Sequence, residues 1–275
     1  MLVCHAQKLC DIPTPAQMQS TNNITDSGIE FKIIKPVPQL SDFVESFWML
    51  ENTSDTAHET VGLPDGRFDI IFSYSSNEPF NVMQMGLGTE PGQHSIPPKI
   101  VMFAVSFKLL AIEYLLDIKA ASLLNTAHPL PTDFWEIKKS DLDDFENFCK
   151  KVSIKMLSLI KPNIDSRKKK LFDLIYSSNG SLPVKELSEQ VFWSSRQINR
   201  YFNEQFGISL KAYCNILRFK TSLHHIKEGK LFPELNFADQ THFIKEVKKF
   251  SGVVPKELFK NQNDRFILLS ALPKK

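Results

Sequence analysis

The pattern of hydrophobic and polar positions is most regular between residues 184 and 207, where it predicts two short helices. Apolar residues recur there every three or four positions, the spacing that places side chains on one helical face. The first helix carries Val184, Leu187 and Val191 on this face, and the second carries Ile198, Phe202 and Phe206. Ser194 precedes the second helix as an N-cap, and Gly207 ends it as a C′ glycine would. The pattern predicts a helix-turn-helix.

The outer face of the second helix carries side chains that suit the reading of DNA. Arginine and asparagine match the edges of guanine and adenine in the major groove. The outer residues are Ser195, Arg196, Asn199, Arg200 and Asn203. No acidic residue interrupts this face before Glu204. Taken alone, the window leaves open the alternative of two packed helices with a solvated polar face.

The charge along the chain favours the DNA-binding interpretation. Residues 166–275 contain 20 Lys and Arg against 10 Asp and Glu, whereas residues 1–165 contain 13 against 21. The near-neutral total therefore combines an acidic half with a basic half. The basic residues lie among strong hydrophobic periodicity, which indicates a folded basic surface. Counterion release would supply much of the DNA affinity of such a surface.

A second segment of the same kind lies at 236–252. Asp239 can cap a helix whose inner residues are Phe243, Val247 and Phe250. The outer residues of this helix are Gln240, Thr241, Ile244, Lys245 and Lys248. Between the two segments, residues 209–229 carry one apolar stripe and predict a continuous helix of up to roughly five turns. Such a helix can hold two DNA-reading units at a fixed separation.

At this point the chain resembles the AraC-type bacterial transcription regulators, over about residues 166–260. The resemblance rests on the blocks VKELSEQ…SSRQINRYFNEQFGISLKAY and FADQTHFIKEVKKFSGVVP, and on Arg218 between them. It implies two helix-turn-helix units, joined by a long helix, that read successive major-groove segments of one duplex. It also implies that Arg218 contacts the phosphate backbone or braces the linking helix. The implied base readers are Arg196, Asn199 and Arg200 in the first unit, and Gln240, Thr241, Ile244 and Lys245 in the second.

The chain departs from the family pattern in the second unit. The stretch from Gly229 to Asn236 is shorter than usual, and Pro233 disfavours a regular helix there. Val247 stands where Phe is usual, and Val254 where Thr usually caps the last helix. These departures keep three interpretations open. The chain is a sequence-specific regulator, or a protein- or small-molecule-binding module whose second unit no longer reads DNA. The third interpretation is a protein that binds DNA without sequence preference.

The N-terminal half predicts a different architecture. From Gly28 onward, short runs rich in Phe, Ile and Val alternate with Pro, Gly, Asn and Asp, which is typical of strands and turns. The order of elements over about 30–135 loosely resembles a sensor domain found ahead of AraC-type reading heads, and implies a partly open barrel with an unidentified ligand. Trp48, Asp65, Arg67 and Asp69 could line a pocket. The favoured interpretation is that Trp48 is core and the other three shape and solvate a turn.

The sequence therefore predicts an α+β protein, in which a β-rich, partly open barrel precedes an all-α domain with two helix-turn-helix units joined by a long helix. A periodic helix over 140–161 either supports a homodimer or docks on its own barrel, and Pro162–Asn163 marks the boundary after it. The expected organisation is a poorly ordered start (1–26), a sensor or oligomerisation domain (27–135), a helical linker (136–162), a DNA-binding domain (163–263) and a C-terminal tail (264–275).

Other functions find little support. The sequence has no Gly-rich phosphate loop, His-Glu-x-x-His pair or nucleophile elbow, so we expect no enzyme and no cofactor. The four cysteines lack CxxC spacing, which predicts neither disulfides nor a zinc site; a metal at Cys4, His5 and Cys10 is the less favoured alternative to a mobile start of chain. No apolar run reaches the length of a membrane span, so we expect a cytoplasmic protein. The expected partners are double-stranded DNA, a homodimer mate, a small-molecule effector and RNA polymerase, without a membrane.

Overall fold

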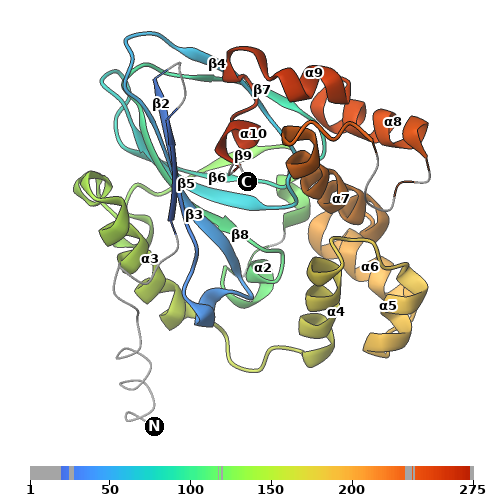
Figure 1. Ribbon diagram of the computed structural model, residues 1–275. Coiled ribbons are helices and arrows are strands. Elements are labelled where there is room, and N and C mark those ends of the chain that lie inside the picture. The colour runs from blue at the N-terminus through green and yellow to red at the C-terminus, as the bar shows by residue number, and fades with distance from the viewer. Residues whose placement is uncertain are drawn as a thin grey trace.

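The protein has a sheet-rich N-terminal part and a helical C-terminal part, which lie side by side (Figure 1). The computed structural model describes residues 20–24, 28–116, 118, 120–232, 237 and 239–272. The order of strands and helices confirms the α+β fold class. Cys4, His5, Cys10 and the segment 233–236 lie outside the described residues, so the predictions for them stay predictions.

Seven strands form the main sheet in the order β1-β2-β3-β8-β5-β6-β9, and β4 pairs with β7 in a second sheet. All the pairings are antiparallel. The strands are β1 (Ser20–Ile24), β2 (Ile29–Ile34), β3 (Val44–Asn52), β4 (His58–Gly62), β5 (Phe68–Tyr74), β6 (Asn81–Met85), β7 (Gly92–Ile96), β8 (Val101–Phe107) and β9 (Ala127–Leu130). The central strands β3, β8 and β5 are covered on both faces, which explains their nearly unbroken apolar runs.

The helix α3 (Phe145–Leu159) covers one face of the main sheet. Its apolar stripe packs on Phe72 and Phe103, with ring centroids of Phe103 and Phe145 5.0 Å apart and those of Phe72 and Phe148 5.4 Å apart. The stripe is therefore used by the protein's own sheet, the second of the two expected alternatives. Of the apolar residues of α3, Ile154 and Leu159 remain exposed, and a homodimer stays a prediction.

The helical part follows α3 after a short turn. Its helices are α4 (Ser166–Ser177), α5 (Val184–Val191), α6 (Ser195–Phe206), α7 (Leu210–Lys227), α8 (Gln240–Ser251), α9 (Pro255–Lys260) and α10 (Ile267–Ala271). Shorter helical turns are α2 (Ala111–Tyr114) and the 3₁₀ helices η2 (Pro38–Leu40), η3 (Ala120–Leu123), η4 (Phe134–Glu136), η5 (Lys139–Asp143) and η6 (Gln262–Asp264). The helices α5 and α6 form the expected helix-turn-helix, and α7 is the expected linking helix.

Local chemistry fixes the ends of α6. The Ser194 hydroxyl accepts from the Gln197 backbone N–H, and the Gln197 side chain accepts from the Ser194 N–H, which is a capping box. Gly207, with φ +74°, ends the helix in the left-handed conformation that the sequence predicted for it. Phe192 ends α5 in the same conformation, which is unusual for a bulky residue.

Two expectations about the chain ends are wrong. Residues 20–24 belong to strand β1, which pairs with β2 along its whole length, and not to a poorly ordered start. Residues 264–272 are no tail, because they form the end of η6 and the helix α10. Phe266 and Leu269 are buried in the main core, and Ile267 joins a second core cluster on the sheet. Neither segment has the periodicity that marks longer elements.

A single apolar core passes through both parts of the molecule. It joins sheet residues such as Phe47 and Phe107 to helical residues such as Phe172, Phe202 and Tyr213. The two parts are therefore packed together as extensively as two layers of one domain. This close packing places the surface of the sheet part directly beside the helices of the predicted DNA-reading part.

We expect Phe202→Ala to lower the free energy of unfolding by about 3–5 kcal/mol, because truncation leaves a cavity in this core. Phe202 is fully buried, and its ring centroid lies 5.1 Å from that of Phe206 and 5.8 Å from that of Tyr213. Guanidinium unfolding followed by circular dichroism measures the change. Arg196→Ala, on the exposed face of the same helix, should stay within about 0.5 kcal/mol of the parent. The reverse order of the two effects would contradict the assignment of inner and outer faces.

Candidate nucleic-acid interface and interdomain cavity

The outer face of α6 is open to solvent. Arg196, Arg200 and Asn203 are exposed, while Ser195 and Asn199 are half-buried. The Asn199 side chain donates to the Ser195 carbonyl at 3.0 Å, within its own helix. Arg200 lies 3.9 Å from Glu204, and both side chains are 71% exposed, so this ion pair holds the guanidinium only weakly. The structure thus brings all the predicted first-unit readers together on one accessible face.

The helix α8 presents a smaller free face. Asp239 caps it by accepting from the His242 backbone N–H at 2.8 Å, as the sequence predicted. Thr241 and Lys245 are exposed. By contrast, the Gln240 side chain donates to the Leu231 carbonyl at 3.0 Å, and Ile244 packs against the core. Two of the four predicted second-unit readers therefore also have structural contacts.

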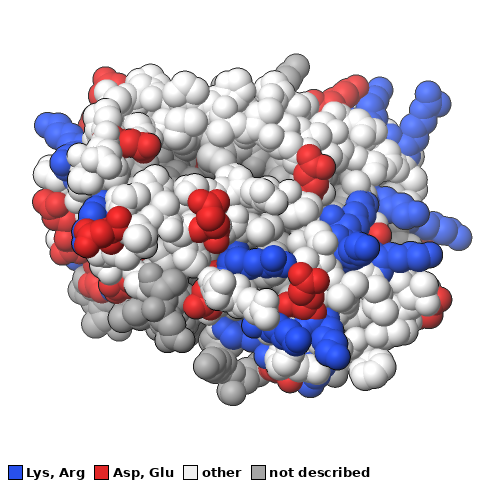
Figure 2. Space-filling model, turned by 90° about the horizontal axis from the view of Figure 1, so that it is seen from above, with Lys and Arg blue, Asp and Glu red and all other residues white. Residues whose placement is uncertain are grey.

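The linking helix α7 holds both units, since it contacts α6 on one side and α8 and α9 on the other. Arg218 is half-buried on this helix and donates to the Asn215 side chain. This contact lies within one turn of the same helix, and both expected roles of Arg218 stay predictions. Figure 2 shows Lys and Arg gathered at the end of the molecule that carries the helical part.

The sheet part contacts the flank of α6 beside its outer face. The Glu113 carboxylate accepts from the Tyr201 hydroxyl at 2.5 Å and from the Lys168 ammonium at 2.7 Å. The Gln205 side chain donates to the Ile118 carbonyl at 2.9 Å. Tyr201 and Gln205 lie on the side of α6 that faces away from Arg196. The docked sheet part therefore leaves the predicted reading face uncovered.

A buried polar network joins the two parts behind these helices. The Arg67 guanidinium donates to Glu45 at 3.0 Å, to the Tyr213 hydroxyl at 3.2 Å and to the Gly66 carbonyl at 3.0 Å. The Tyr213 hydroxyl in turn donates to the Gly66 carbonyl at 3.0 Å. Arg67 is only 8% exposed, so the favoured interpretation of a solvated turn is wrong for this residue. Asp65 does shape the turn, because it accepts from the Arg67 backbone N–H.

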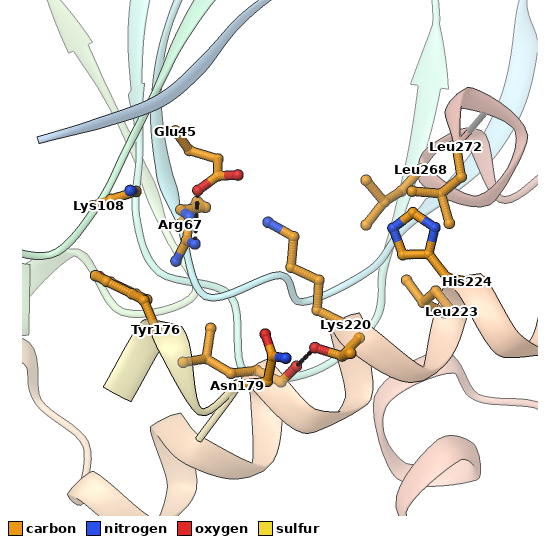
Figure 3. A pocket seen from close by; sticks show the side chains of 12 residues that line it. Glu45, Arg67, Lys108, Tyr176, Asn179, Lys220, Leu223, His224, Leu268 and Leu272 are labelled. Atoms are coloured by element: carbon orange, nitrogen blue, oxygen red, sulfur yellow. Dashed lines mark hydrogen bonds and ion pairs between the residues drawn. The ribbon is translucent and has the colours of Figure 1, made fainter. Parts of the chain in front are cut away.

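Next to this network lies a cavity of about 310 Å³ (Figure 3). Its walls come from the sheet, from α4 and α7, and from α10 at the C-terminus. The charged lining residues are Arg67, Lys108, Lys220 and Glu45, so cations outnumber carboxylates three to one. The apolar lining residues are Leu217, Leu223, Leu268 and Leu272. Figure 3 shows Leu268 and Leu272 on the opposite side of the cavity from Arg67 and Lys108.

The charges in the cavity favour an anion. Burial lowers the pKa of Lys108, and the charge of Arg67 lowers it further. Burial alone would raise the pKa of Glu45, but the charges of Arg67, Lys220 and Lys35 hold it well below its usual range. Glu45 is thus ionised and already paired with Arg67, while the Lys108 ammonium donates to the Ser41 carbonyl at 2.7 Å. An anion beside Lys108 would stabilise its ammonium form.

Asp69 lies on the sheet near this network but does not line the cavity. Burial, helped by the charge of Asp65, raises the pKa of Asp69 to about 7, although the nearby Ser106 and Trp48 side chains act in the opposite direction. One of its carboxylate oxygens is buried without a hydrogen-bond partner. Trp48 is half-buried and stacks on Phe31 against the second core cluster, so it lies at the edge of the core and does not line the cavity.

Sequence reasoning found the outer faces of α6 and α8 but missed the cavity. Its lining residues come from stretches as distant as Glu45 and Leu272, and no local pattern links them. The one usable signal was the unusual cluster of Asp65, Arg67 and Asp69 in a strand-turn segment. In the described part of the chain, no group of three or more His, Cys, Asp or Glu residues could hold a metal ion. No helix among the described residues is both long and apolar enough to cross a membrane.

Comparison with known proteins gives a family model and several solved structures. The model, described as Domain of unknown function (DUF6597), matches residues 32–129, from β2 to β9. No curated protein matches the chain. One structure of ToxT from Vibrio cholerae is 13% identical, covers 88% of this chain and 98% of its own, and has a TM-score of 0.39. A second ToxT structure is 11% identical, covers 94% of this chain and 100% of its own, and has a TM-score of 0.40. A third, with an unsaturated fatty acid bound, is 13% identical, covers 90% of this chain and 97% of its own, and has a TM-score of 0.40. The likeness is low and concerns the overall arrangement.

We expect Asp69→Asn to abolish a decline of stability between about pH 4 and pH 7. In this window the folded state keeps a proton that the unfolded state, with an ordinary pKa of 3.8, has released. The stability of the parent protein therefore falls as the pH rises, by on the order of 2 kcal/mol given the partial exposure of the side chain. Urea unfolding at several pH values measures the slope. Parallel slopes in both proteins would contradict the raised pKa.

Proposed function

We propose that this protein is an AraC-type transcription regulator that binds double-stranded DNA at specific sequences. The observation that carries the proposal is the outer face of α6. This face combines two exposed arginines with amide side chains, on a helix whose ends are fixed by a capping box and a left-handed glycine. Such a rigid element can hold forked donors against base edges in the major groove. The docked sheet part leaves it uncovered.

The arrangement of α7 supports a second reading helix. It contacts both α6 and α8, so the two would face successive major-groove segments about one DNA turn, roughly 34 Å, apart. Thr241 and Lys245 are the free side chains of α8 and are the base-reading candidates there. The contacts of Gln240 and Ile244 favour a narrower role for α8 in sequence selection. Contacts of Lys245, Lys248 and Lys249 with phosphate groups would let α8 still contribute to the affinity for DNA.

The cavity supports an effector as the second partner. Arg67 and Lys108 on one side, Lys220 between, and Leu268 and Leu272 on the other side match a small organic anion with an apolar body, such as a carboxylic acid with an alkyl chain. Two of the similar solved structures, both of ToxT, contain an unsaturated fatty acid and a naphthalenyl butenoic acid. Binding of this ligand class to the present chain is part of the proposal. A cytoplasmic location, a homodimer and contact with RNA polymerase remain expectations that accompany a regulator.

The first test of the proposal is the selection of genomic DNA fragments by the purified full-length protein. We expect a preferred site, with affinity that falls steeply with salt because phosphate contacts release counterions. If no fragment is enriched and the folded protein binds no DNA, the regulator is rejected, and a ligand-binding module takes its place. If all fragments bind equally, the protein is a sequence-blind DNA binder.

We expect Arg200→Ala to weaken binding to the preferred site by about 1–3 kcal/mol and to relax the preference at one base position. The reason is that Arg200 is exposed on the outer face and only weakly paired. Titrations of the preferred site and of a scrambled duplex measure both effects.

The matched control for this prediction is Arg200→Lys, which keeps the charge but loses the forked geometry. It should lose sequence preference while it keeps most of the affinity for scrambled DNA. If Arg200→Ala weakens binding equally on every duplex, and Arg200→Lys restores it, Arg200 contacts phosphate and reads no base.

We expect straight-chain carboxylates to bind the cavity and Lys220→Met to weaken their binding about tenfold. Lys220 lines the cavity with its ammonium 3.3 Å from Asp65, so an anion would replace or share this partner. Isothermal titration with decanoate measures the effect. Lys211→Met, an exposed change on the same helix outside the cavity, is the control and should leave binding unchanged. Equal losses in both variants would show that decanoate binds elsewhere.

A further inference from the structure

The last described segment of the chain bridges the two parts of the molecule. After α9 the chain turns at Asn261, which has a φ of +37°, and passes through η6 into α10. The Asn261 side chain holds this turn, because it accepts from the Phe266 backbone N–H at 2.9 Å and donates to the Ser270 hydroxyl at 2.7 Å. We call residues 265–272 the strap.

The strap is anchored to the sheet part at its beginning. The Arg265 carbonyl accepts from the Val61 backbone N–H at 2.7 Å and from the Thr60 hydroxyl at 2.8 Å, both on β4. Ile267 is buried in the sheet cluster. These are contacts between residues about 200 positions apart in sequence, so they tie the end of the chain back onto its beginning.

The strap is anchored to the helical part at its end. The Lys227 ammonium, on the last turn of α7, donates to the carbonyls of Leu269 and Ser270 at 2.9 Å each, and to that of Leu272. These carbonyls lie at the C-terminal end of α10, where a helix has unsatisfied acceptors and favours a cation. The Lys227 ammonium therefore binds three carbonyls at the C-terminal end of the strap.

Between these anchors, the strap forms a wall of the cavity. Leu268 and Leu272 line it beside His224, as Figure 3 shows. The helix α10 has five residues, too few for a helix to be stable alone in water. Its stability depends on its contacts. Leu268 and Leu272 are half-buried against the main core, and the rest of their surface faces the cavity.

We propose that the strap reports whether the cavity is filled. An organic anion with an apolar body would pack on Leu268 and Leu272, stabilise α10, and thereby strengthen the link between the sheet part and the helical part. Without the ligand, the strap opens more often and the link is weaker. This inference rests on the proposed effector site, and it adds the element through which occupancy of that site reaches the rest of the protein.

Hydrogen exchange of the full-length protein, with decanoate as the probe, tests the proposal. We expect saturating decanoate to slow exchange in 265–272 about tenfold or more. Lys227→Met should speed exchange there without ligand and weaken decanoate binding severalfold, because linkage makes the two effects reciprocal. Lys211→Met, on the same helix but far from the strap in sequence, should change neither.

Leu268→Ala provides the second variant, because it removes a ligand contact and keeps the Lys227 bonds. It should reduce the factor by which decanoate slows exchange in 265–272, measured against the exchange of the same variant without ligand, because Leu268 also packs against the main core. If Lys227→Met speeds exchange across the whole chain, Leu268→Ala alone decides the matter.

The outcomes separate this inference from the proposed effector site. If decanoate binds, Lys220→Met weakens it, and exchange in 265–272 does not change, the strap proposal is overturned and the effector site stands. If decanoate does not bind the parent protein, the effector site is rejected, and the strap proposal falls with it. DNA binding is measured independently of both results.

Discussion

The buried guanidinium of Arg67 is the constraint on which the assembly of the two parts depends. A charge held away from water costs much free energy unless it is paired. The hydrogen bonds of Arg67 come from its two terminal nitrogens, whereas its buried Nε has no hydrogen-bond partner among the described residues. Glu45 supplies the opposite charge, and the Gly66 carbonyl and the Tyr213 hydroxyl supply further acceptors. Because Tyr213 belongs to α7 and Arg67 to the sheet part, separation of the two parts would leave Arg67 without one of its partners. The linking helix is therefore fixed to the sheet part through its first turn.

This constraint also determines where a ligand can act. The ring of Tyr176 stacks under the Arg67 guanidinium, and its hydroxyl bonds to that of Tyr213 and accepts from the Leu109 N–H. Tyr176 and Arg67 both line the cavity, so an occupant would contact the network that holds the two parts together. The helix α6 is connected to this network through the shared core, since Phe172 packs on Phe202 and Tyr176 packs on Tyr213.

Periodicity predicted the helices well because their apolar stripes are local. Ile198, Phe202 and Phe206 are fully buried, as their spacing required, and the caps at Ser194, Gly207 and Asp239 are where the sequence indicated. The missed features all depend on contacts distant in sequence. The strand β1 is too polar to show a strand pattern, and α10 is five residues long and held by Val61 and Lys227. The sequence placed Arg67 in a turn because its neighbours Asp65 and Gly66 do form one. Its burial depends on Tyr213, which lies 146 positions away and could not be linked to it by any local pattern.

The composition of the cavity walls limits how strongly the proposed effector can stabilise the packing of the two parts. A ligand that needs the sheet, α7 and the strap together binds only the docked arrangement, and it stabilises that arrangement by about 2.7 kcal/mol at a hundred times its dissociation constant. This is comparable with the energy of breaking one charged, buried hydrogen bond. The effector can therefore shift the docking equilibrium only if the empty protein is within a few kcal/mol of separating. Two features weaken the packing of the two parts in the protein without a ligand. Leu268 and Leu272 face the cavity, and the charged form of Lys108 is destabilised by burial, which lowers its pKa.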